Sequence, residues 1–345
     1  MWWLFLLFIW LLWESTHYAI HHQQVRRWRS HHHLHTSVRD KWNHERQVTI
    51  PNKQLHLQLA QRLHIYDQQS VLRPHYKPIL YHGLLRGAHE TAFAMAKYCG
   101  WRCTIHHGVW FWERGTGSTI LFLHGFGFGP YAYGRFLNTL STYYRVVAPQ
   151  YPGLSYDGRM DIPEIQDYAR TITSYLSEER YSIISNSFGT IVHHAILREL
   201  SDTANSRIRQ QIYVEPVCFY PYAGQLFSFI ELSWRTCLTA PTWKASMVAA
   251  MSYLLVAKDR STLYLCQQIL QDPRWDGEVH LPHIPSTIIL SELDNLIKVP
   301  ELQEYFNLHY PSVTVVVLPG AYHGEALFSP RLKINTLLFP CTTKE

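Results

Sequence analysis

The sequence predicts an α/β fold with a mostly parallel central sheet flanked by helices. From about residue 106 onward, short apolar runs of strand length alternate with longer helix-like stretches, which is the pattern of βαβ units. Hydrophobic residues make up 47% of the 345-residue chain and charged residues 17%, a composition that forms a packed core and argues against disorder. The length fits one large domain with extensions.

The individual elements follow from the period of the apolar residues. Strands are expected at 108–115, 118–125, 144–153, 181–185, 211–219, 286–290 and 313–320. Helices are expected between and after them, at 130–141, 163–178, 188–200, 300–308 and 327–338. Two further helices are expected earlier, at 54–66 and at 87–101, the second stopped by Gly100.

Residues 220–285 interrupt this alternation, because they contain aromatic, helix-like runs and no convincing strand. An insertion of this size between two core strands predicts a helical cap over the carboxyl edge of the sheet, where α/β folds bind ligands. The expected organisation begins with a hydrophobic membrane anchor (1–13), followed by a basic, His-rich linker with a helical pre-domain (14–104). The α/β core is expected in two pieces (105–219 and 286–345), with the cap (220–285) between them.

The N-terminal segment MWWLFLLFIWLLW is apolar throughout. As a helix it reaches only about 20 Å, short of the ~30 Å hydrocarbon core, so we expect a shallow membrane anchor with Trp2, Trp3, Trp10 and Trp13 at the interface. Basic residues follow the segment, which places the C-terminal domain in the cytosol by the positive-inside rule. Two alternatives stay open: a cleaved signal peptide of a secreted protein, although the basic start and small-residue cleavage site are missing, and a buried helix.

Charge and metal-binding residue types exclude some classes of function. The net charge of +5 is too small to indicate nucleic-acid binding, and the basic surplus in residues 21–50 fits contact with a membrane surface. The tract HHHLH at 31–35 could suggest a metal site, but a solvated basic linker is the expectation. Neither a metal nor a cofactor is predicted. The six cysteines form no CxxC pair, so reduced thiols are expected.

Ser187 lies in SIISNSFGTIVHH (182–194), where a predicted strand must turn sharply into a predicted helix. It is either a helix N-cap or a nucleophile held on the bend. A nucleophile elbow needs small residues two positions before and after the serine. Ser185 and Gly189 meet this requirement, although serine replaces the usual first glycine.

The run LFLHGFGFGP (121–130) places a glycine-rich loop directly after a predicted buried strand. Backbone N–H groups of Phe126 and of Phe188, the residue after the candidate nucleophile, are the expected oxyanion donors. The alternative is a phosphate-binding loop, but the run has neither the GxGxxG spacing nor a GK[ST] ending.

A catalytic acid is expected after a later strand, and Asp294 in SELDNLIKVP (291–300) fits. Glu292 and Glu215 are weaker candidates for the same role, and a helix cap or a solvated loop charge is the alternative for all three carboxylates.

The expected base is His323, in the loop LPGAYHGEALF (318–328) that follows the last predicted strand. The chain order is then Ser187, Asp294, His323, which is the order seen in one fold family. His193 and His194 follow the elbow and are expected to be packing or surface residues.

These motifs together resemble the α/β-hydrolase superfamily over roughly residues 105–340. The matching pieces are HGFGFG (124–129), YPGLS (151–155), SNSFG (185–189), the Asp294 loop and GAYHG (320–324). HGFGFGPYAY with EPVCF (215–219) is also similar to a branch of membrane-anchored eukaryotic members. That branch more often has Asp where this chain has Glu215, and His where it has Asn186.

The resemblance implies a serine hydrolase that cleaves carboxylic esters or thioesters through an acyl-enzyme, with Ser187, Asp294 and His323 as the triad. A small-molecule or lipid ester is the expected substrate, because aromatic side chains of the cap would suit an apolar acyl chain. These are Phe227, Phe229, Trp234, Trp243 and Tyr253. The same aromatics could simply pack the cap. A membrane-tethered, non-catalytic binding or scaffold protein and an acyltransferase using the same triad are the alternative functions.

Overall fold

A computed structural model describes the part of the chain that carries the predicted core. The described residues are 9–20, 23, 77–127, 129–155, 157, 159, 162–177, 179–200, 207–219, 238–239, 242–243, 246–247, 250, 253, 256, 259–271, 284–294, 296–329 and 332. The predicted helix at 54–66, the HHHLH tract and most of the predicted cap lie outside them. The same holds for Cys237, Cys341 and the first eight residues of the predicted anchor.

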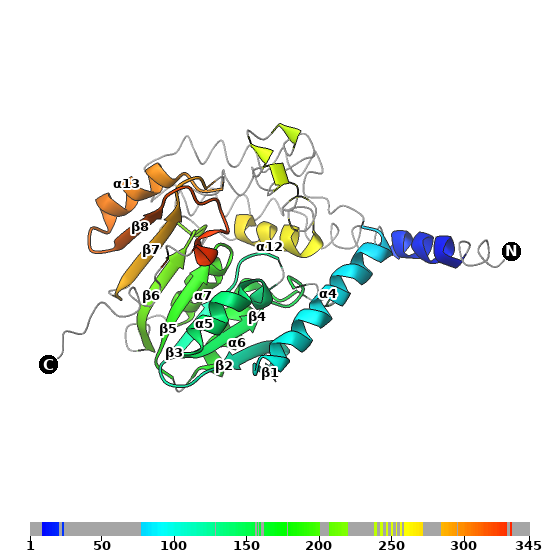
Figure 1. The fold of residues 1–345 in the computed structure, drawn as a ribbon, viewed down its shortest axis with the longest axis horizontal. Helices are drawn as coiled ribbons and strands as arrows, with labels where there is room; N and C mark the ends of the chain where they lie inside the picture. The colour runs from blue at the N-terminus through cyan, green and yellow to red at the C-terminus, as the bar shows by residue number, and fades with distance from the viewer. Residues whose placement is uncertain are drawn as a thin grey trace. The chain divides into compact units, whose positions relative to one another are not determined.

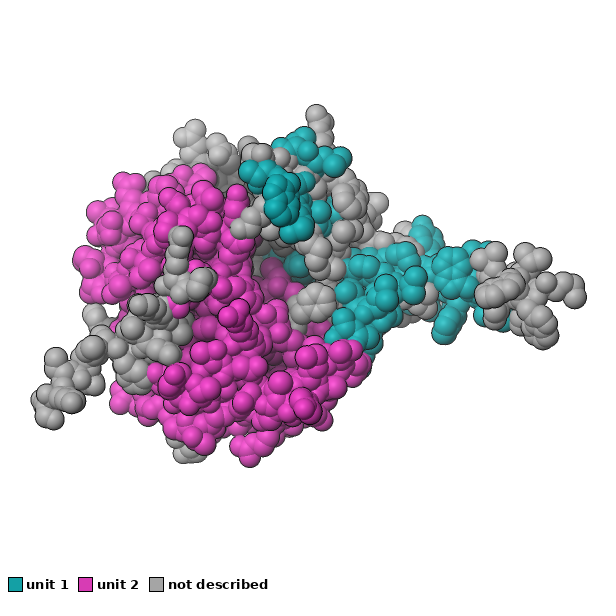
Figure 2. Space-filling view, in the orientation of Figure 1, with its two compact units in different colours: residues 1–88, 227–274 teal, residues 89–226, 275–345 magenta. Residues whose placement is uncertain are grey.

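The chain divides into two compact units, coloured separately in Figure 2. Unit 1 comprises Met1–Ala88 and Phe227–Arg274, and unit 2 comprises His89–Leu226 and Trp275–Glu345. Every strand of the sheet and every predicted site residue belongs to unit 2. Unit 1 includes helix α12, Arg260–Gln271. The domain limits given by the sequence stay predictions.

Unit 2 is built on one eight-stranded sheet with the order β1-β2-β4-β3-β5-β6-β7-β8 (Figure 1). β1 and β2 pair antiparallel, as do β2 and β4, and all other neighbours are parallel. The bounds are β1 Arg102–His106, β2 Val109–Arg114, β3 Thr119–Leu123, β4 Arg145–Gln150, β5 Tyr181–Asn186, β6 Ile208–Val214, β7 Ser286–Ser291 and β8 Thr314–Leu318. The mostly parallel sheet is therefore confirmed.

Helices connect the strands close to where the apolar period predicts them. They are α4 Ile79–Tyr98, η1 Gly129–Tyr133, α5 Gly134–Leu140, α6 Ile165–Tyr175, α7 Gly189–Leu200, α13 Val299–His309 and the short η4 Ala326–Phe328. The helix expected at 327–338 is seen only as η4 within the described residues. Gly100 does end α4: it has φ +85°, and Trp101 N–H and Gly100 N–H donate to the carbonyls of Ala96 and Lys97, which is a Schellman motif.

Strand β1 is absent from the sequence prediction. Its side chains are mostly exposed because it is an edge strand, so no apolar alternation marks it. A two-residue turn at His107 and Gly108 joins it to β2, and both residues have positive φ, +45° and +77°. This is the geometry of a type I′ hairpin, here with histidine in the first turn position.

The central strands are buried on both faces, as a parallel sheet requires. Every residue of β3 is buried, and all residues of β7 after the first. A cluster containing Phe122, Val146, Ile184 and Ile289 forms the interior on one side. The carboxyl ends of β3, β5, β6 and β7 therefore belong to a rigid, closely packed sheet, which can hold reactive groups in place.

Residues 9–20 form a helix, and Trp10, Leu12 and Trp13 in it are exposed. Among the residues that the structure describes, no helix has both the length and the apolarity needed to cross a membrane.

Candidate active site

Ser187 occupies the sharp turn between β5 and α7, with a backbone φ of +49° that is unfavourable for a non-glycine residue. Its N–H donates to the Val214 carbonyl at 2.9 Å, which fixes the bend to β6. A Cβ on Gly189 would lie 2.2 Å from the Leu123 carbonyl oxygen and 2.8 Å from that of His124. Only glycine lets α7 start this close to β3, so the small-residue requirement at this position has a direct steric cause.

Ser185 takes the position of the usual first glycine of the elbow. Its side chain is fully buried, and its Oγ lies 2.9 Å from His193 Nδ1 and 3.4 Å from the Ile212 carbonyl. His193 is also buried and stacks on Tyr213 with ring centroids 4.3 Å apart. Serine is tolerated here because its hydroxyl is paired inside the core, and His193 has a packing role, as expected.

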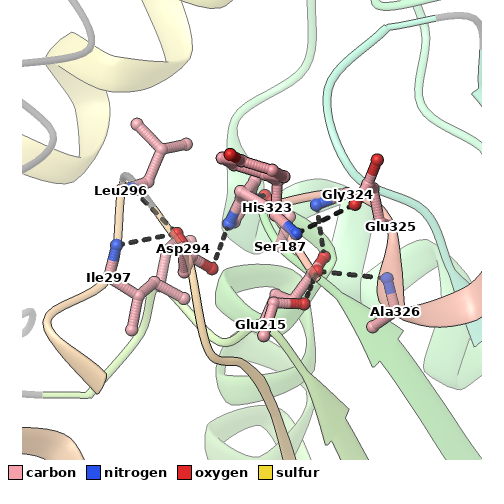
Figure 3. Close-up of polar contacts among 12 residues, drawn as sticks. Ser187, Glu215, Asp294, Leu296, Ile297, His323, Gly324, Glu325 and Ala326 are labelled. Carbon is pink, nitrogen blue, oxygen red and sulfur yellow. Dashed lines mark hydrogen bonds and ion pairs between the residues drawn. The ribbon is translucent and has the colours of Figure 1, made fainter. Parts of the chain in front are cut away.

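The structure brings together the three residues predicted to form the triad, although 136 residues separate Ser187 from His323. Ser187 Oγ lies 2.8 Å from His323 Nε2, and His323 Nδ1 lies 2.7 Å from Asp294 Oδ2 (Figure 3). Asp294 is completely buried as a side chain, and His323 is 11% exposed. A serine, an imidazole and a carboxylate in this order form the hydrogen-bond chain by which a serine is activated.

The loop after β7 holds the Asp294 carboxylate in place. Its Oδ1 accepts hydrogen bonds from the N–H groups of Leu296 and Ile297, at 2.7 and 2.9 Å. Its other oxygen is thereby left to face His323. Glu292, the weaker candidate two residues earlier, is exposed and accepts a hydrogen bond from Gly320 N–H instead.

Glu215, the other candidate acid, lies directly after β6 and is fully buried. Its carboxylate accepts hydrogen bonds from the backbone of the loop that carries His323 (the histidine loop, 318–328), at Gly324 and Ala326. It also contacts Asn186 and Ser291. The acid that directly contacts the imidazole is therefore Asp294.

The electrostatic surroundings of His323 favour its charged form. Burial lowers the pKa of the imidazole, but the adjacent Asp294 carboxylate, its hydrogen bond and the charge of Glu215 outweigh burial and raise the pKa to about 9. The two carboxylates thus stabilise the charged form of the ring.

The glycine-rich loop after β3 lies against the elbow. A Cβ on Gly125 would lie 3.2 Å from the Cβ of Ser187, and the rings of Phe126 and Phe188 stack with centroids 4.5 Å apart. The two residues predicted to supply the oxyanion donors are thus neighbours beside Ser187. Their backbone role stays a prediction.

His124 holds this loop in place. Its Nδ1 lies 2.7 Å from the Gly125 carbonyl, and its Nε2 accepts a hydrogen bond from Tyr151 N–H at 3.1 Å. Burial lowers the pKa of His124 to about 4, so the ring is neutral and donates from Nδ1. Sequence reasoning identified the His-Gly pair but not this function of its imidazole.

Tyr133 and Asn186 are site residues that sequence reasoning did not find. Tyr133 OH donates to Asn186 Oδ1 at 2.7 Å and accepts a hydrogen bond from Gly125 N–H at 3.3 Å. Asn186 Nδ2 donates to Glu215 at 3.1 Å. The only signal in the sequence was the position of Asn186 next to the serine, since none of these contacts is local.

A strand-turn-helix serine on a mostly parallel sheet, followed by an acid loop and a histidine loop, defines the hydrolase class of α/β protein. Residues 120–332 match the model of the alpha/beta hydrolase family, and the chain belongs to that family. The comparison with curated proteins gives no significant match.

Solved structures of the same fold include a thermophilic esterase from Thermogutta terrifontis. It is 14% identical, with a TM-score of 0.50, and the match covers 69% of this chain and 96% of the esterase. A bacterial membrane phospholipase A is 15% identical with a TM-score of 0.52, over 80% of this chain and 94% of the phospholipase. At these identities the likeness establishes the fold alone.

Proposed function

We propose that this protein is a serine hydrolase that cleaves carboxylic esters or thioesters through an acyl-enzyme. The observation that carries the proposal is the continuous contact from Ser187 Oγ through the His323 ring to Asp294 Oδ2, at 2.8 and 2.7 Å. The positive φ of Ser187 supports it further, because a helix N-cap needs no such strain.

In the proposed reaction, His323 Nε2 takes the proton from Ser187 Oγ while that oxygen forms a bond to the carbonyl carbon of the substrate. Asp294 keeps the Nδ1–H tautomer and stabilises the imidazolium. The N–H groups of Phe126 and Phe188 hold the oxyanion, and each such donor contributes about 10²–10³ in rate.

Collapse of the tetrahedral intermediate breaks the bond to the leaving alcohol or thiol, which receives the proton from His323. A water molecule then gives a proton to His323 and attacks the acyl carbon. Collapse of this second tetrahedral intermediate breaks the bond to Ser187 Oγ and releases the acid, and His323 returns the proton to Oγ, which restores the Ser187 hydroxyl. Every step uses residues of this chain. Transfer of the acyl group to an acceptor other than water would use the same steps.

For the substrate, we propose an apolar or lipid ester and a membrane location through residues 1–13, with the catalytic domain on the cytosolic side. The exposed Trp10 and Trp13 support contact with a membrane interface. Of the cap aromatics, Trp243 is exposed and Tyr253 half-buried, and Phe227, Phe229 and Trp234 lie outside the described residues.

Rates on p-nitrophenyl esters of increasing chain length test the substrate proposal. Equal rates on acetate and on long-chain esters would reject a lipid substrate. Protease protection in microsomes tests the orientation.

The central test is covalent labelling of the full-length protein by a fluorophosphonate probe. Wild type is expected to label, and Ser187→Ala and His323→Ala are expected not to. Ser185→Ala is the matched control, because Ser185 is a buried serine two residues away that faces His193. Folded wild type that does not label would reject the proposal and favour the non-catalytic binding protein.

A further inference from the structure

One buried carboxylate at the site takes no proton and forms no covalent bond in the proposed reaction. Glu215 is completely buried, has a strained backbone φ of +48°, and lies where β6 ends beside the elbow. Burying a carboxylate without strong pairing costs free energy, so groups around Glu215 are expected to stabilise it.

Four hydrogen-bond donors converge on this carboxylate (Figure 3 draws two of them on the histidine loop). One oxygen accepts from Ser291 Oγ at 2.5 Å and from Ala326 N–H at 3.3 Å. The other accepts from Asn186 Nδ2 at 3.1 Å and Gly324 N–H at 2.7 Å. An ionised carboxylate accepts only, so it satisfies all four contacts, whereas a protonated one would oppose a donor with its own hydrogen.

The four donors come from the segments that carry the candidate triad. Asn186 directly precedes Ser187, and Gly324 directly follows His323. Ser291 ends β7, and its carbonyl accepts a hydrogen bond from Asp294 N–H at 3.0 Å. A single carboxylate therefore links the serine, histidine and aspartate segments, although these are far apart in the sequence.

We propose that Glu215 is a positioning residue that holds the histidine loop in register with the elbow and places a second negative charge near the His323 imidazolium. This inference rests on the serine-hydrolase function proposed above. The hydrogen-bond network continues through Asn186 and Tyr133 to the N–H of Gly125. The same carboxylate therefore also helps to position the glycine-rich loop that contains Phe126.

The test compares Glu215→Gln, Glu215→Asp and wild type in the full chain, measuring the rate of fluorophosphonate labelling across pH. Glutamine keeps the size of the Glu215 side chain but removes its negative charge. Its amide N–H group would also face two of the four hydrogen-bond donors, where an oxygen now accepts from both. We expect labelling about 10–100-fold slower, since a small displacement of a reacting group costs that much, and an inflexion of the pH profile shifted to lower pH. Aspartate keeps the charge, but its shorter side chain holds the carboxylate farther from the four donors. It should therefore slow labelling and leave the inflexion of the pH profile in place.

Glu292→Gln is the matched control, because Glu292 also accepts a backbone N–H from this region, at Gly320, but from the exposed side. It should change neither the rate nor the inflexion. A folded Glu215→Gln protein with the wild-type rate and inflexion would overturn the proposal. If that variant does not fold, a Glu215→Asp protein that labels as fast as wild type would overturn it.

The titration of His323 separates this inference from the proposed function. In protein with ¹³C-labelled histidine, assigned with His323→Gln, the His323 signal should titrate at lower pH in Glu215→Gln than in wild type. If wild type does not label, the hydrolase proposal fails, and this titration alone still decides whether Glu215 acts on His323. An unchanged titration would reject the charge contribution.

Discussion

Asn186 donates a hydrogen bond from Nδ2 to the Glu215 carboxylate at 3.1 Å, although the two residues are 29 positions apart. They meet because Asn186 ends β5, where it pairs with Val214, and Glu215 directly follows β6, the neighbouring parallel strand. A short amide at the end of one strand therefore faces a longer acid beside it.

We expect the exchange of this pair to be strongly non-additive. Asn186→His alone crowds the longer acid, and Glu215→Asp alone withdraws the carboxylate, so each should slow ester hydrolysis about tenfold or more. The double variant should recover most of the loss, with a coupling energy of about 1–2 kcal/mol, in the range for contacting residues. A double-mutant cycle on kcat/KM measures this. Asn186→His combined with Glu292→Asp is the control, and a cycle that is additive for both pairs would contradict the prediction.

The activity is expected to rise with pH until His323 is mostly neutral. The imidazole must be unprotonated to accept the serine proton, and its pKa is raised to about 9, so kcat/KM should increase toward that pH and then level off. Asp294→Asn removes the charge that raises the pKa and loses the tautomer, which should shift the inflexion to lower pH and reduce kcat by about 10³–10⁴. Stopped-flow or steady-state rates across pH test this, and an inflexion unmoved by Asp294→Asn would argue against the assignment.

Gly189→Ala is expected to disrupt the fold. The added Cβ would lie 2.2 and 2.6 Å from the carbonyl oxygen and carbon of Leu123, and these are backbone atoms of a buried strand that cannot move aside. We expect a loss of several kcal/mol, in the range of severe overpacking, seen as a lower Tm or insoluble protein. Gly134→Ala in α5 is the control, since nothing lies within 4 Å of its added Cβ, and it should leave Tm equal or slightly higher.

Stability is expected to be greatest near pH 6.5 and to fall on either side. Burial lowers the pKa of His124 to about 4, and burial together with the charge of His194 lowers that of His193 to about 3. The unfolded chain then binds protons that the folded protein excludes, so stability is lost as pH falls from about 6.5 toward 3–4. His323 acts oppositely: with its pKa raised, its contribution is full below about 6.5 and is lost as pH rises toward 9.

Thermal denaturation at several pH values measures these slopes. His193→Phe keeps an aromatic ring against Tyr213 and cannot take up a proton, so it should flatten the acid slope. Equal acid slopes in wild type and His193→Phe would show that the buried imidazole does not contribute.

The sequence by itself determined the α/β class, the strands from β2 to β8 to within a few residues, and the elbow at Ser187. These are local properties, because strand burial, helix period and the need for Gly189 are all written in neighbouring residues. It also placed Asp294 and His323 in loops after the last strands, where a parallel sheet brings carboxyl ends to one edge. Their roles stay predictions.

Only the tertiary structure decided which polar groups touch. It paired Asp294, and not Glu292 or Glu215, with the imidazole of His323, and it joined Glu215 to Asn186, Ser291 and the histidine loop. It also revealed edge strand β1, whose exposed side chains carry no periodic signal. The physical reason is the same in each case: such contacts depend on strand order and register across the sheet, and no local pattern of residues encodes distances between segments that are far apart in the chain.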